Sequence, residues 1–156
     1  MRLLTHNFLK SNVKNTSNGY PLKIEPTEII YEESVVDRIM VEKMSQKIDY
    51  KALTLAYSSI KQASSEGGIA DFSWPDDLPE TLPDGDLSEE LIILLHQILF
   101  DIHVINGKLS TVHVYFHYCK HSNNCFCLGS LICPGTGRKF PIVNSIPNMI
   151  LHEDEL

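Results

Sequence analysis

Histidine and cysteine side chains crowd into the stretch between residues 113 and 133. The members of this tract are His113, His117, Cys119, His121, Cys125, Cys127 and Cys133. Four nitrogen or sulfur ligands satisfy a tetrahedral Zn²⁺ ion, so the residue types suit a structural zinc site. Their spacing, HxxxHxCxH followed by CxC, departs from the paired C-x₂₋₄-C pattern of zinc ribbons. Two interpretations stay open, a zinc site and a cluster without a ligand role, and the spacing favours the second.

Catalytic signatures are missing from the sequence. No glycine fingerprint for a dinucleotide or for S-adenosylmethionine follows a predicted strand, and no serine occupies a Gly-x-Ser-x-Gly elbow. The run that starts at Gly135 lacks the spacing of a phosphate-binding loop. The acidic pairs Asp76-Asp77 and Glu89-Glu90 are explained by solvated charge and by a helix start. The sequence therefore predicts a protein without a catalytic site of its own.

The charge balance of the chain is acidic. Among 156 residues, 13 Lys and Arg stand against 20 Asp and Glu, which gives a formal net charge of −7. Nucleic-acid binders present a basic face, because phosphate contacts supply much of their affinity. We therefore do not expect this chain alone to bind RNA or DNA. The charge fits a partner protein that docks through a limited apolar patch.

Two apparent secretory signals, the sequon at Asn15 and the final residues EDEL, have meaning only inside the endoplasmic reticulum. The N-terminus lacks the apolar core of a signal peptide, and no apolar run reaches the length of a transmembrane helix. We therefore expect no membrane association and a location in the cytoplasm and nucleus. In those compartments the four cysteines are expected to be free or metal-bound.

The two ends of the chain have the alternation of strands. The predicted strands lie within residues 1–33, with a reversal at 15–19, and at 131–133 and 139–143 around a Pro-Gly-Thr-Gly turn. We expect both termini to build one small β-unit.

The middle of the chain has helical spacing. A first helix is predicted from about Ser34 and a second from an N-cap at Asp49. After a loop over 64–83, a third is predicted from Asp86, with Glu89 completing a capping box and an apolar face that runs to Ile102. These helices would form an insertion packed against the β-unit, so the expected fold class is α+β.

Three spaced motifs carry a resemblance to a known family. They are THNFL at 5–9, CPGTGRKFPI at 133–142 and IPNMIL at 146–151. With these segments the chain resembles the tRNA methyltransferase 112 family, the multifunctional methyltransferase subunit. The match spans nearly the whole chain except about twenty residues near 110–130.

The resemblance implies a fold and a function. The fold would be a zinc-ribbon-like β-domain built from residues 1–33 and 104–156, with a helical domain at 34–103. Members of the family are non-catalytic and form heterodimers with Rossmann-type methyltransferase catalytic subunits. These act on tRNA, on small-subunit rRNA and on a glutamine of a translation termination factor. The partner binds S-adenosylmethionine, and RNA is met only through the partner.

Some members of the family hold structural zinc through four cysteines. The matching positions here are Ser11, Thr16, Cys133 and Thr136. Only one of the four is a metal ligand, so the resemblance implies a chain without structural zinc. Packing must then hold the β-unit, and the candidates for that role are Phe8, Leu22, Phe140, Ile142 and Ile146.

The segment Lys108–Gly129 interrupts the resemblance. Removing these 22 residues joins HVING to SLICPG in register with the family, and the edges of the segment are compatible with splice sites. We favour the hypothesis that the segment is a translated intron. The alternative is a genuine loop insertion, ordered by a metal ion.

A docking surface for the methyltransferase is expected from a strand around Thr5–Leu9 and from the stretch Phe140–Leu151, by addition of a strand to the partner's sheet. The residues assigned to it are Thr5, His6, Asn7, Phe8, Leu9, Arg138, Phe140, Pro141, Ile146, Pro147, Asn148, Met149, Ile150 and Leu151. The alternative function is a stand-alone zinc-ribbon-like RNA-binding module. Metal content and RNA affinity without a partner would distinguish the two.

Overall fold

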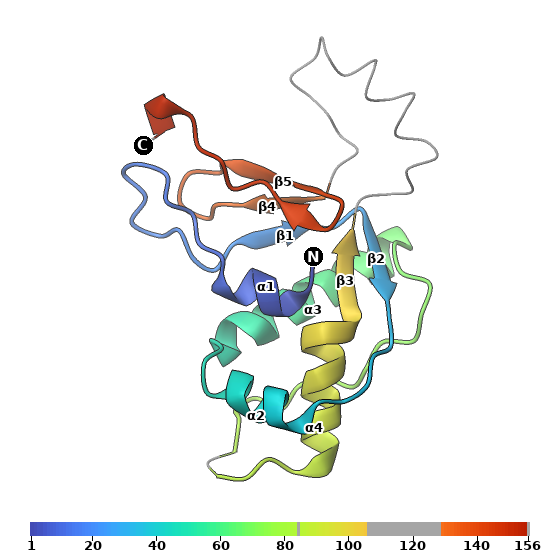
Figure 1. Ribbon diagram of the computed structural model, residues 1–156. Helices are drawn as coiled ribbons and strands as arrows, with labels where there is room; N and C mark the ends of the chain where they lie inside the picture. The colour runs from blue at the N-terminus through green and yellow to red at the C-terminus, as the bar shows by residue number, and fades with distance from the viewer. Residues whose placement is uncertain (84, 106–128, 156) are drawn as a thin grey trace.

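The computed structural model describes residues 1–83, 85–105 and 129–155. Two antiparallel sheets and a set of helices make up this part of the chain (Figure 1). The larger sheet has the order β1-β4-β5-β6, formed by β1 (Lys23–Glu25), β4 (Ser130–Ile132), β5 (Lys139–Val143) and β6 (Ile146–Pro147). The smaller sheet pairs β2 (Glu28–Tyr31) with β3 (Ile102–Ile105). The α+β class is therefore confirmed.

The first element is a helix, α1 (Leu3–Phe8), where the sequence predicted a strand. Leu3, His6 and Asn7 share its buried side, with the i, i+3, i+4 spacing of a helical face. Two of these three residues are polar, so hydrophobicity alone does not reveal the helical period. The helix packs against α3 (Tyr50–Gly67), β3 and the π-helix η1 (Gln97–Asp101) that precedes β3.

Side-chain caps fix where the central helices begin. The Asp37 and Asp49 carboxylates accept hydrogen bonds from Met40 N and Ala52 N at the starts of α2 (Arg38–Ser45) and α3 (Tyr50–Gly67). The cap at Asp49 was predicted and is confirmed. For α4 (Glu89–His96) the predicted cap at Asp86 is wrong, because the Ser88 hydroxyl caps that helix. The helix α2 begins at Arg38, later than the start at about Ser34 that the apolar residues predicted.

The apolar helix that begins with α4 changes from α-helical to π-helical geometry near its end. A π-helix, η1 (Gln97–Asp101), follows α4 without a break and leads into β3, so the helix predicted to run to Ile102 is confirmed as far as Asp101. The carboxylate of Asp101 is buried there and accepts a 2.6 Å hydrogen bond from the Ser34 hydroxyl. This bond ties the end of the helix to the segment that leads into α2.

The core joins the larger sheet to the helices. Leu22, Phe140 and Ile142 are buried in it, as predicted. Phe8 and Ile146 are not, since their side chains are exposed. The prediction that these two hold the β-unit together is therefore wrong.

The two described residues that flank 106–128 lie close together. A Cβ atom placed on Gly129 would lie 3.6 Å from the carbonyl oxygen of Ile105 and 3.3 Å from that of Glu25. The carbonyl of Gly129 also accepts a 2.8 Å hydrogen bond from Ile142 N. The end of β3 and the start of β4 are thus adjacent in space.

No helix among the described residues combines the length and the apolar character that crossing a membrane requires.

Candidate docking surface

A tight hairpin forms the edge of the larger sheet. Val143 pairs with Ile146 across the turn, and Ile142 pairs with Pro147. The turn residues Asn144 and Ser145 have φ angles of 50° and 62°, the left-handed pair that a two-residue hairpin turn uses. The strand β6 is the last in the sheet, so one of its sides has no neighbouring strand among the described residues.

The hairpin presents apolar side chains to solvent. Ile146 is 69% exposed, and its cross-strand partner Val143 is exposed as well. Val143 was absent from the predicted set, although its alternation with the buried Ile142 could have identified it. A sheet edge with exposed apolar residues tends to pair with another chain. This edge is the exposed apolar feature that coincides with the predicted docking segment Phe140–Leu151.

The segment after β6 continues the apolar surface. Asn148 N donates to the carbonyl of Pro141 at 2.8 Å, and the Asn148 side chain accepts from Ile150 N at 3.1 Å. Ile150 is 74% exposed, whereas Met149 and Leu151 on either side pack partly against the core. Ile150 is therefore available to a partner, and its neighbours hold the segment in place.

Arg138 is engaged within the chain. Its guanidinium pairs with both carboxylate oxygens of Glu155, Nε with Oε1 at 2.7 Å and Nη2 with Oε2 at 3.1 Å. The carbonyl of Glu155 accepts a hydrogen bond from Lys14 N, so the short helix η3 (Glu153–Glu155) is held against the 10–20 loop. The structure thus gives Arg138 an internal role in place of the expected contact with a partner.

The motif THNFL divides between interior and surface. The His6 ring lies 2.8 Å from the carbonyl of Leu22, and the Asn7 amide exchanges two hydrogen bonds with the backbone of Asp49. Both side chains are buried, so they fix α1 in place and are not docking residues. Thr5 and Phe8 are exposed, Phe8 by 54%, and Leu9 is half-buried.

The other predicted residues divide in the same way. Phe140 is buried in the core, which removes it from the docking surface. Pro141 and Pro147 are half-buried and Asn148 is exposed. The residues left to a partner are therefore Val143, Ile146, Asn148 and Ile150 on the hairpin and tail, with Thr5 and Phe8 on α1.

An open groove of about 570 Å³ lies between α3, β1 and the 18–22 loop. His6 is one of its lining residues, and burial lowers the pKa of this imidazole although the Leu22 carbonyl acts in the opposite direction. The ring is therefore neutral at physiological pH and already hydrogen-bonded. It has the features of a structural residue, and its neighbours in the groove are mostly apolar.

The described residues contain no group of three or more His, Cys, Asp and Glu side chains arranged to hold a metal ion. Of the histidine and cysteine tract, only Cys133 belongs to them. Its other members, and the segment 108–128, lie outside the described residues.

Comparison with known proteins places these features in a family context. A sequence model of the family described as Trm112p-like protein matches residues 2–145. The chain is 33% identical to multifunctional methyltransferase subunit TRM112 homolog A of Arabidopsis thaliana over 159 residues, which cover the whole of both chains. It is 29% identical to the TRM112-like methyltransferase subunit of Caenorhabditis elegans, with 96% of this chain and 95% of the relative covered. The subunit trm112 of Schizosaccharomyces pombe is 28% identical over the full length of both.

Proposed function

This chain belongs to the Trm112p-like family and is a methyltransferase subunit, and we propose from that premise that it is a non-catalytic protein that stabilises and activates its client enzymes. The observation that carries the proposal is the exposed apolar edge at β5–β6. A client that exposes a complementary edge would gain an apolar contact from Ile146 and Ile150, and main-chain pairing along β6 in which Pro147 accepts but does not donate a hydrogen bond. Such an interface typically buries about 800 Å² on each partner.

The proposed clients are Rossmann-type methyltransferases that bind S-adenosylmethionine themselves. Their substrates would be tRNA, small-subunit rRNA and the glutamine of a termination factor. The proposed setting is the cytoplasm and nucleus, where those substrates occur. The relatives' names support the methyltransferase part of this proposal, and the substrates rest on the resemblance to the family.

The distribution of charge supports a role in which RNA is met through the client. Residues 34–103 contain 13 acidic and 5 basic side chains, a net charge of −8, whereas the rest of the chain, with 7 acidic and 8 basic side chains, is close to neutral. A surface of that sign repels phosphate. The helical region is therefore expected to point away from the RNA in a complex, while the β5–β6 edge contacts the enzyme.

Co-expression with candidate catalytic subunits tests the proposal. The chain should co-purify with at least one methyltransferase, raise its soluble yield and increase its turnover, with no methyl transfer by the chain alone. Failure to solubilise or activate any tested client would contradict the proposal. Tight RNA binding by the isolated chain would instead favour the zinc-ribbon-like RNA-binding module.

A further inference from the structure

The 10–20 loop lies directly against the turn between β4 and β5. A Cβ atom on Gly135 would lie 2.8 Å from the carbonyl oxygen of Asn18 and 3.0 Å from Cγ2 of Thr16. A Cβ atom on Gly19 would lie 2.5 Å from the carbonyl oxygen of Ser11. Gly135 thus brings the turn against the loop, and Gly19 brings two stretches of the loop itself together; a side chain at either position would clash with backbone.

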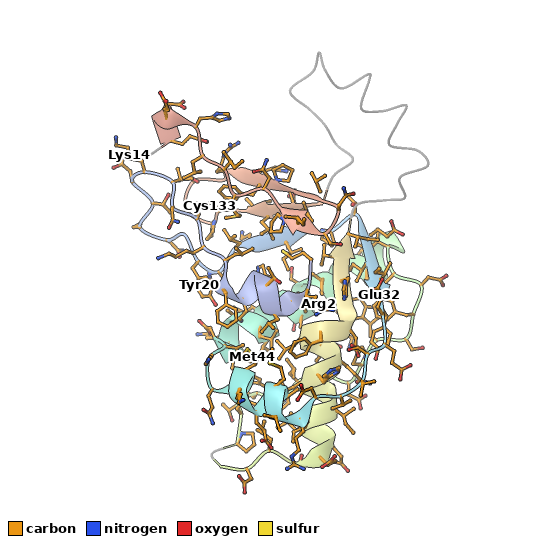
Figure 2. All side chains as sticks on the ribbon, viewed as in Figure 1. Arg2, Lys14, Tyr20, Glu32, Met44 and Cys133 are labelled. Carbon is orange, nitrogen blue, oxygen red and sulfur yellow. The ribbon has the colours of Figure 1, made fainter. Side chains whose placement is uncertain are left out.

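Cys133 lies at the centre of this contact. Its side chain is fully buried, and the groups that act on the acidity of its thiol are the hydroxyls of Ser11 and Thr136 and the backbone at Gly135 and Thr136. Figure 2 shows Cys133 at the end of the sheet that faces the loop carrying Lys14. Its backbone is fixed on both sides, by Cys133 N donating to Arg138 O and Gly137 N donating to Cys133 O, each at 2.9 Å.

These hydrogen bonds change the acidity of the thiol. Burial alone raises the pKa of Cys133, but the donors from Ser11, Thr136 and Gly135 outweigh burial and lower the pKa to about 7. The lowered pKa means that the thiolate form of Cys133 is favoured by hydrogen-bond donors around it. Buried polar groups normally have such hydrogen-bond partners.

The donor set does not fit the zinc ion that the resemblance associates with these positions. Structural zinc takes four nitrogen or sulfur ligands. Here one sulfur, Cys133, is accompanied by the hydroxyls of Ser11, Thr16 and Thr136, which are not ligands of that kind. The side-chain oxygen of Thr16 is buried without a hydrogen-bond partner in the described structure.

We propose that a hydrogen-bonded cluster centred on Cys133 replaces the metal in this chain. The Cys133 sulfur accepts from Ser11 on the loop and from Thr136 on the turn, so it links the same two segments that four cysteines and zinc would link. Cys133 is then a working acceptor and not a vestige of a ligand set. The ion pair between Arg138 and Glu155 closes the same junction from outside.

Metal analysis and thermal unfolding of the full chain test the proposal. The Tm should be unchanged by a strong zinc chelator. Two results would overturn the proposal. The first is zinc that is bound by the unchanged chain and absent from Cys133→Ala. The second is a fall in Tm on adding the chelator that occurs in the unchanged chain and not in Cys133→Ala. Zinc that persists in Cys133→Ala is bound elsewhere and leaves the cluster metal-free, as proposed.

Paired substitutions test the hydrogen bonds. Cys133→Ala and Ser11→Ala should each lower the Tm by several degrees, and the double variant should lose less than the sum, because both remove the same bond. Ser17→Ala, at an exposed position of the same loop, should leave the Tm unchanged. Strictly additive losses would overturn the proposed link between Cys133 and Ser11.

A gain-of-site variant tests the geometry without depending on a loss of stability. Replacing Ser11, Thr16 and Thr136 together by cysteine should create a site that takes up one additional zinc ion per chain and makes the Tm chelator-sensitive. No additional uptake of zinc would show that the four positions do not share one site.

Discussion

Deletion of Lys108–Gly129 should leave the fold intact and make the chain more stable. Gly129, the last residue of the deleted segment, lies against the carbonyl of Ile105, the last residue of β3. In the shortened chain Gly107 would take the place of Gly129, with Asn106 as the single residue between it and β3. One residue can bridge Ile105 and the position of Gly129, because consecutive Cα atoms are about 3.8 Å apart.

The size of the effect follows from loop closure. Closing a connection of n residues costs about (3/2)RT ln n. The connection between β3 and β4, residues 106–129, has 24 residues, and shortening it to the two residues 106–107 reduces the cost by about 2 kcal/mol. For a chain of this size a gain of that amount raises the Tm by about 4 to 8 °C.

Urea and thermal unfolding of the full and shortened chains measure this difference. The far-ultraviolet circular dichroism should keep its helical content, and the shortened chain should still co-purify with a client. A genuine insertion ordered by a metal predicts the opposite sign, because deletion would remove stabilising contacts. A shortened chain that is less stable than the full one would therefore refute the reasoning, and a dominant transcript encoding all of 108–129 would refute the intron hypothesis.

Three further predictions concern the docking edge, the core and acid stability. Ile146→Asp should weaken client binding by about 1 to 2 kcal/mol or more, because the side chain is 69% exposed and that share of an isoleucine's burial energy is left to a partner. The matched control is Val35→Asp, at a position that is 93% exposed and outside the larger sheet. This control should bind normally in the same pull-down titration. Phe140→Ala should lower the free energy of unfolding by about 3 to 5 kcal/mol. Val143→Ala, on the exposed side of the same strand, should lower it far less. Equal losses in urea titrations would contradict the burial of Phe140 and the exposure of Val143. Burial lowers the pKa of His6 in the folded state below the ordinary 6.5, so the unfolded chain binds the proton first and the free energy of unfolding should fall as the pH drops below about 6.5. Unfolding measured at pH 7.5 and 5.5 should show a smaller fall in His6→Gln than in the unchanged chain. An equal fall in both would exclude His6 as a cause of the pH dependence.

The sequence predicted the elements whose patterns are local. The alternation in 139–143 and the turn at Pro134 identify β4 and β5, and Asp49 caps α3 as expected because a capping side chain lies within three residues of its target. The helix α1 was missed because its buried face includes His6 and Asn7. Their partners, Leu22 and Asp49, are distant in the sequence, and a single sequence does not show such pairings.

The docking residues were predicted by motif and not by orientation. A motif groups residues that a family shares, whether they face a partner or the core. Phe140 and Ile146 illustrate the difference, since one is buried and the other is 69% exposed. Alternation along β5 separates the two kinds of position, but it becomes usable only when the register with β4 and β6 is known.

The pairing of β1 with β4 has a consequence for the synthesis of the protein. Glu25 pairs with Ser130, so the larger sheet joins residues that leave the ribosome about a hundred residues apart. At about 5 to 20 residues per second, β1 waits for roughly 5 to 20 s before its partner strand is made. During that interval the nascent chain presents an unpaired strand, and the side of α1 that the finished fold buries has no partner. We therefore expect assembly with a client to follow completion of the chain, and chaperones to protect the early segment until then.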